Sequence, residues 1–104
     1  MPTAFDVLGD PTRRRILDLL RGRERAVGEL VAELELAQPT VSKHLRALRG
    51  AGMVAVRPEA QQRFYRLRPE PLLELDAWLA PFRQHWDERL DRLAQHLDEM
   101  EDEP

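Results

Sequence analysis

The chain has 104 residues, a length that suits one small domain with a marginal core. Its formal net charge is −3. It contains no cysteine, which excludes disulfides, thiolate metal sites and cysteine nucleophiles from this sequence. No stretch reaches the roughly 18 consecutive apolar residues of a membrane span, so we expect a cytoplasmic protein with no membrane partner.

The first half of the chain predicts three helices. Asp10 can cap the first helix and Pro11 suits its first position, while apolar residues at 16, 17, 19 and 20 form a face that ends near Gly22. A short helix is expected over 27–34, and a three-residue turn separates it from a third helix that begins at 38. Residues 27–50 therefore have the dimensions of a helix-turn-helix.

The third predicted helix has two different faces. Val41, Leu45 and Leu48 fall on one apolar stripe at the helical period. Lys43 and Arg46 point the other way, so the exposed face is short, polar and basic. Such a helix is narrow enough to enter the major groove of DNA with its first turns facing base edges.

Two β runs follow the third helix. They lie at 53–56 and 63–67, and residues 58–62 are expected to connect them as a loop. The pattern predicts a hairpin over 53–67, which could serve as a wing along neighbouring DNA phosphates. The expected fold class is mainly α with a small β hairpin, a winged helix-turn-helix.

Residues 69–100 read as one long helix with apolar residues at a mean spacing near 3.6. Pro81 lies inside this pattern and should kink the helix or split it in two. The apolar stripe is larger than so small a core can cover, so we expect it to form a homodimer interface. Its expected interface residues are Leu79, Phe82, Trp86, Leu90, Leu93 and Leu97. We expect residues 101–104 to be a disordered acidic tail.

Charge is strongly separated along the chain. Residues 38–68 contain seven lysines and arginines against one acid, whereas residues 69–104 contain eleven acids against three arginines. These counts make the first segment net +6 and the second net −8. A basic segment of this kind favours nucleic acid as a partner, although a winged-helix module for protein contacts remains an alternative.

Four segments together resemble the ArsR (arsenical-resistance-repressor) family of winged helix-turn-helix transcription regulators. They are residues 8–13 (LGDPTR), 38–45 (QPTVSKHL), 48–54 (LRGAGMV) and 63–67 (RFYRL). The resemblance implies a homodimer that binds double-stranded DNA, usually a repressor released from its operator by an inducer. Here the inducer is unknown. It also implies that the N-terminal segment around Phe5 and Leu8 joins the last helix in the dimer interface.

The resemblance also implies which residues contact DNA. The recognition-helix positions are Gln38, Thr40, Ser42, Lys43 and Arg46, and the wing positions are Arg57, Gln61, Gln62 and Arg63. His44 matches a frequent family histidine, but it lies at the edge of the apolar stripe, so we expect it to pack rather than to contact a base.

Three positions depart from the family pattern. Glu35 stands where glycine is common in the turn, and Ala37 stands where a serine or threonine cap is common. Either the turn differs, or a left-handed Glu35 costs about 1 kcal/mol. The wing tip also lacks glycine, which leaves its turn type open.

A family metal site on the last helix is matched in part by His85, His96 and Glu99. Arg83 replaces an expected aspartate, and the two histidines would be about 16 Å apart on one helix. We therefore expect no metal and no cofactor, with a metal-responsive repressor as the alternative. We expect no enzyme either, because the sequence has no glycine-rich phosphate loop and no nucleophile, histidine and acid set.

Overall fold

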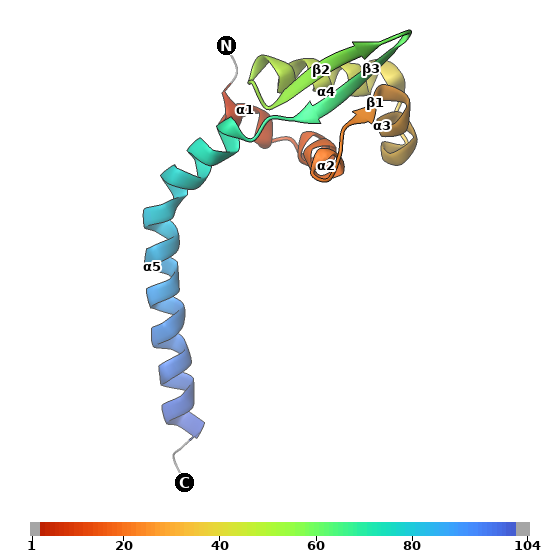
Figure 1. Ribbon diagram of the computed structural model, residues 1–104. Helices are drawn as coiled ribbons and strands as arrows, with labels where there is room; N and C mark the ends of the chain where they lie inside the picture. The colour runs from red at the N-terminus through yellow and green to blue at the C-terminus, as the bar shows by residue number, and fades with distance from the viewer. Residues whose placement is uncertain (1–2, 102–104) are drawn as a thin grey trace. The chain divides into compact units, whose positions relative to one another are not determined.

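The computed structural model describes residues 3–101 (Figure 1). The chain forms two compact units that divide after Leu73, and the last helix runs across this division. The elements in chain order are α1 (Ala4–Leu8), α2 (Pro11–Leu20), β1 (Arg25–Ala26), α3 (Val27–Leu34), α4 (Gln38–Gly50), β2 (Val54–Glu59), β3 (Gln62–Leu67) and α5 (Glu70–Glu101).

The start of α2 confirms the predicted cap. Asp10 has an extended backbone, and its side chain accepts hydrogen bonds from the backbone N–H groups of Thr12 and Arg13 at 2.8 and 3.2 Å. Pro11 occupies the first helical position, where no N–H group is needed. The helix ends at Leu20, slightly before the predicted end at Gly22.

The turn between α3 and α4 uses a left-handed glutamate. Glu35 has φ 55° and ψ 41°, and its N–H group donates to the carbonyl of Val31. Of the two possibilities expected for this turn, the structure therefore has the left-handed Glu35, whose Cβ atom strains the backbone in this conformation. Ala37 precedes α4 without a side-chain cap, as expected.

The wing belongs to a small antiparallel sheet with the strand order β1-β3-β2. The predicted hairpin is confirmed, but its third strand was not predicted. Strand β1 has only two residues, Arg25 and Ala26, which face Tyr65 and Phe64 of β3. Figure 1 shows β1 beside β3 and directly before α3, so the sheet connects the wing to the start of the helix-turn-helix.

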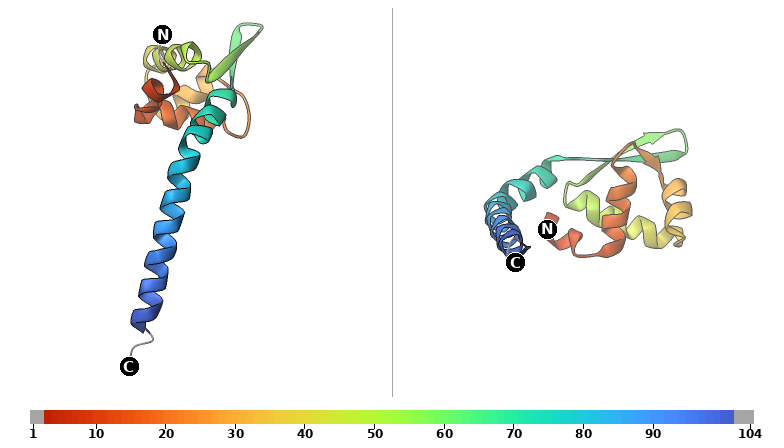
Figure 2. Two further views of the ribbon diagram at one scale, coloured as in Figure 1. Left: turned by 90° about the vertical axis from the view of Figure 1, so that its left-hand side faces the viewer. Right: turned by 90° about the horizontal axis from the view of Figure 1, so that it is seen from below.

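The hairpin is longer than the sequence pattern indicated. We expected a loop over 58–62, but β2 continues to Glu59, and Glu59 pairs with Gln62 across a two-residue tip. Pro58 is tolerated because β2 is an edge strand, where a missing N–H group need not break a ladder bond. Ala60 takes the left-handed conformation at the tip, with φ 55°. The hairpin extends beyond the helices of its unit (Figure 2).

The core of the first unit contains the predicted apolar faces. Val41, Leu45 and Leu48 of α4 are buried, as are Ile16 and Leu20 of α2. Leu30 and Leu34 of α3, Met53 and Val54 at the start of the wing, and Tyr65 of β3 complete much of this cluster. Because α4 buries one stripe so fully, its opposite face is fixed toward solvent.

Helix α5 is one helix over Glu70–Glu101 with Pro81 inside it (Figure 2). Of the two outcomes expected at Pro81, a kink or a split, the split therefore does not occur. Arg83 spans the proline, because its guanidinium forms an ion pair with the carboxylate of Asp76 at 2.7 Å and donates a hydrogen bond to the Asp76 carbonyl at 3.3 Å. Glu101 still belongs to the helix, so the prediction of a disordered tail was wrong for this residue. The rest of the predicted tail, residues 102–104, lies outside the described residues. Among residues 3–101, no helix is long and apolar enough to cross a lipid bilayer.

Candidate nucleic-acid interface

The exposed face of α4 presents most of the predicted recognition residues. Gln38, Thr40, Lys43 and Arg46 are exposed, and Ser42 is half-buried. Lys43 and Arg46 lie on the face opposite the buried stripe of Val41, Leu45 and Leu48, whose burial sets the rotation of the helix. Thr40 and Ser42 flank that face. The helix begins at Gln38, so these side chains lie on its first turns, the part that reaches base edges in helix-turn-helix proteins.

A groove joins this face to the wing. It has a volume of about 770 Å³ and lies between α4, the wing and the start of α3. The structure brings six predicted DNA-binding residues together along it: Gln38, Ser42 and Arg46 from α4, and Gln61, Gln62 and Arg63 from the wing. Thr40, Lys43 and Arg57 are exposed but do not line the groove.

Arg49 also lines the groove, although it was not among the predicted contacts. The available signal was its spacing, because a residue three positions after Arg46 lies on the same side of a helix. The side chains of Lys43, Arg46, Arg49 and Arg63 form no ion pair or hydrogen bond with any residue in the described part of the chain. Their charges are therefore available to phosphate.

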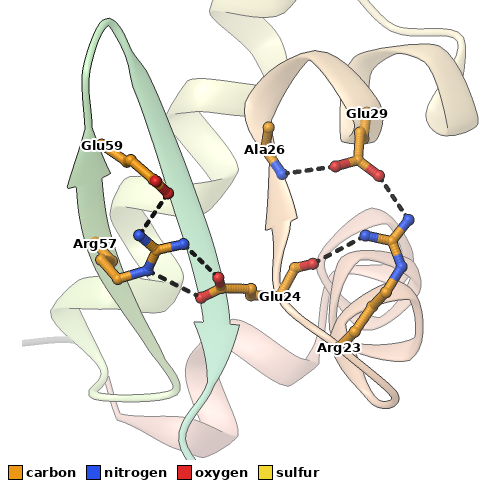
Figure 3. A network of polar contacts seen from close by, with 6 residues as sticks. All are labelled: Arg23, Glu24, Ala26, Glu29, Arg57 and Glu59. Atoms are coloured by element: carbon orange, nitrogen blue, oxygen red, sulfur yellow. Dashed lines mark hydrogen bonds and ion pairs between the residues drawn. The ribbon is translucent and has the colours of Figure 1, made fainter.

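One acid, Glu29, lies in the groove, and its charge is held by arginines. Arg23 donates to it at 2.7 Å (Figure 3). Arg25 lies 3.8 Å from the same carboxylate oxygen. The hydrogen bond from Arg23 is the main cause that keeps the pKa of Glu29 below its ordinary value, and the Ala26 N–H group adds to it. Glu29 is thereby oriented toward the protein and satisfies the start of α3.

Arg57 differs from the other bases of the wing because it has acidic partners. It donates to Glu24 and to Glu59, as Figure 3 shows, and its guanidinium lies 4.9 Å from the ring centroid of Phe64. The hydrogen bond with Glu24, followed by the one with Glu59, raises the pKa of Arg57 above its ordinary value. The same bond from Arg57 lowers the pKa of Glu24.

His44 faces the protein rather than the groove. It is half-buried, and its Nδ1 accepts a hydrogen bond of 3.2 Å from Nε of Arg13 on α2. This contact supports the prediction that His44 packs within the domain.

The residues predicted for a dimer interface differ in exposure. Phe82, Trp86, Leu90, Leu93 and Leu97 on α5 are 47–62% exposed. They recur at three or four residues, so they share one face of α5. Leu79 is half-buried, Phe5 is 57% exposed, and Leu8 packs partly against the core of the first unit. Trp78, at 56% exposure and 4.9 Å from the ring of Phe82, was not among the predicted residues.

The metal candidates are not brought together within one chain. Across residues 3–101, no three histidine, cysteine or acidic side chains lie close enough to hold one ion. His85, His96 and Glu99 all lie along α5, where the two histidines are eleven positions apart.

The fold and this basic face define a winged helix-turn-helix protein, and comparisons with known proteins agree. Residues 10–56 match the arsR family of bacterial regulatory proteins. The chain is 38% identical to the helix-turn-helix-type transcriptional regulator Rv2034 of Mycobacterium tuberculosis, over 96% of this chain and 91% of that protein. It is 31% identical to the transcriptional repressor SdpR of Bacillus subtilis, over 86% of this chain and 100% of the relative.

Solved structures show the same fold. The crystal structure of a possible transcriptional regulator for arsenical resistance has a TM-score of 0.72 and 36% identity, and the match covers 92% of this chain and 97% of that one. The chain therefore belongs to the arsR family of bacterial regulatory proteins, and it is a DNA-binding transcriptional regulator.

Proposed function

We propose that the protein is a homodimeric repressor that binds an inverted-repeat operator through α4 and the wing. The observation that carries this proposal is the groove lined by Arg46, Arg49 and Arg63, whose charges have no acidic partner among the described residues. Such cations release counterions from DNA when they bind phosphate, and this release supplies much of the affinity. The name of the relative SdpR, a transcriptional repressor, supports a role in repression.

The proposed contacts divide into two kinds. Gln38, Thr40, Ser42 and Arg46 would contact base edges in the major groove, because they lie on the first turns of α4. Lys43, Arg49 and Arg63 would bind phosphates, with Gln61 and Gln62 supporting the wing along the backbone. Arg57 belongs to the wing by position, but it forms ion pairs with Glu24 and Glu59.

The second copy would pair through the apolar face of α5. Trp86, Leu90, Leu93 and Leu97 are each about half exposed, which is a large apolar surface for a chain of 104 residues. An ordinary stable interface buries about 1,500 Å². Phe5 and Leu8 of α1 would join the same interface. Two-fold symmetry would then place two α4 helices about 34 Å apart, one turn of DNA.

The signal that releases the protein is not part of the proposal. A thiolate sensor is excluded within this sequence because it has no cysteine, and the histidines of α5 do not meet in one chain. We propose a regulator without enzymatic activity, acting in the cytoplasm, where its DNA is.

Equilibrium binding to DNA from the protein's own promoter tests the proposal. Arg46→Ala should lower the affinity by about 1 to 3 kcal/mol, the range for an arginine that contacts a base. Arg21→Ala removes the same charge outside the groove and should change the affinity less than about twofold. Equal effects of the two substitutions would contradict the placement of the recognition helix.

A further inference from the structure

Arg57 is the one base in residues 38–68 that two carboxylates hold at once. Its Nη1 donates to Glu59 at 2.7 Å, while its Nε and Nη2 both donate to Glu24. Its side chain is still 46% exposed, so solvent reaches it and a phosphate could in principle do so. Yet the three side chains together carry a net charge of −1, which repels phosphate rather than attracting it.

The geometry of this cluster crosses the whole sheet. Arg57 lies on β2 and faces Phe64 of β3 directly in the register, with its guanidinium over the Phe64 ring. Phe64 in turn faces Ala26 of β1. Glu24 immediately precedes β1, so the contact between Arg57 and Glu24 connects one edge of the sheet to the other across β3.

This connection matters because the ladder between β1 and β3 is short. Only Arg25 and Ala26 pair with β3, whereas β2 pairs with β3 through six residue pairs. The two strands of the hairpin are therefore well paired with each other, but few backbone pairs join the hairpin to the segment that leads into α3. Arg57 and Glu24 add a side-chain contact at that weak junction. Arg66 also acts on Glu24, by its charge.

We propose that Arg57, held by Glu24 and Glu59 over the Phe64 ring, is a positioning residue that orients the wing toward α4, rather than a phosphate contact. The proposal rests on the DNA-binding face described above. It assigns phosphate binding in the wing to Arg63 and gives the two acids a role beside DNA. Without Arg57, both carboxylates would be unpaired charges next to the phosphate backbone.

Glu24→Gln distinguishes the two roles by the sign of its effect. If Arg57 contacts phosphate, removing an acid frees Arg57 and should tighten DNA binding. If Arg57 positions the wing, the substitution should weaken binding by about twofold to fivefold, which lies within the range for exposed ion pairs. The matched control is Glu33→Gln, which removes the same charge from an exposed position of α3.

Two substitutions of Arg57 supply a second readout. Both should weaken promoter binding, and Arg57→Lys should weaken it as much as Arg57→Gln, because lysine cannot donate to two carboxylates in the arginine geometry. The slope of log affinity against log salt should stay unchanged, since no phosphate contact is lost. A slope smaller in magnitude by about 1.8 in Arg57→Gln, about 0.9 for each protomer of the dimer, with Arg57→Lys near wild type, would overturn the proposal.

Amide hydrogen exchange in the protein without DNA tests the positioning role of Arg57 independently of the DNA-binding face. Exchange at Arg25 and Tyr65, where β1 pairs with β3, should be faster in Glu24→Gln than in Glu33→Gln. Unchanged exchange, or tighter promoter binding by Glu24→Gln, would overturn the role of Arg57. If Arg46→Ala leaves promoter binding intact, the DNA-binding face itself fails, whatever Arg57 does.

Discussion

Arg13 of α2 donates a hydrogen bond from its Nε to Nδ1 of His44 on α4, over 3.2 Å. The bond joins the recognition helix to the helix that the Asp10 cap begins, at the edge of the buried stripe of α4. It also requires an unprotonated Nδ1 on His44, because a ring nitrogen that carries hydrogen cannot accept. His44 thus has a structural partner on the side away from the groove.

Replacing His44 with alanine should lower the free energy of unfolding by about 1 kcal/mol, the net value of one such hydrogen bond. Urea denaturation of His44→Ala, Arg13→Ala and the double variant measures the coupling between the two side chains. The second substitution should add little once the first has been made. Strictly additive losses, or a loss of DNA affinity as large as that of Arg46→Ala, would show that His44 acts elsewhere.

The free energy of unfolding should fall at acidic pH, because protonation of Asp10 removes its stabilising charge. Desolvation opposes the shift, but the hydrogen bonds from the backbone N–H groups of Arg13 and Thr12, with the charge of Arg13, hold the pKa of Asp10 below its ordinary value of 3.8. A depressed folded-state pKa means that the stabilisation is fully present above the unfolded-state pKa of about 3.9 and is lost as pH falls through the folded-state value.

Asp10→Asn tests this pH dependence, because asparagine can cap the helix without a charge. The wild type should be more stable than the variant at pH 7, and the difference should shrink well below pH 4. Urea denaturation of both proteins at each pH gives the difference, in which the other acids cancel. An equal difference at both pH values would mean that the charge of Asp10 does not stabilise α2.

Replacing Glu35 with glycine should stabilise the protein. Its left-handed backbone strains a residue with a Cβ atom by about 1 kcal/mol, and glycine has no such strain. We expect Glu35→Gly to raise the free energy of unfolding by up to about 1 kcal/mol. Glu33→Gly, in the helical backbone of α3, should lower it by a similar amount. A destabilised Glu35→Gly would show that the glutamate side chain supports the turn.

The apolar face of α5 should control the oligomeric state. Leu90→Glu places a charge among Trp86, Leu93 and Leu97, so it should raise the dimer dissociation constant at least about tenfold, as expected for a charge buried in an apolar interface. Gln95→Glu adds the same charge away from this stripe and should leave the dimer intact. Analytical ultracentrifugation measures both. A dimeric Leu90→Glu with wild-type affinity would place the interface elsewhere.

The helices were predictable because their signals are local. The stripe of Val41, Leu45 and Leu48 and the cap at Asp10 each need only a few neighbouring residues to be recognised, and both are confirmed. The β1 strand was not predictable from its two residues, since its pairing with Tyr65 joins segments about 40 positions apart.

The ion-pair partners of the arginines could not be predicted from the sequence either. Glu24 and Arg57 are 33 positions apart, and only the strand order β1-β3-β2 brings them together. For the same reason, a count of bases in residues 38–68 could not separate Arg57 from Arg46 and Arg63. The groove that joins α4 to the wing likewise depends on how the hairpin continues beyond Pro58.

In the proposed complex, a dimer presents two copies of α4 and the wing to one face of DNA. Hydroxyl-radical footprinting of the promoter with the wild-type protein tests it most directly. We predict two protected segments centred about 10 base pairs apart and related by an inverted repeat, since the recognition helices of a dimer lie one turn apart. A single protected segment, or protection without inverted symmetry, would contradict the account.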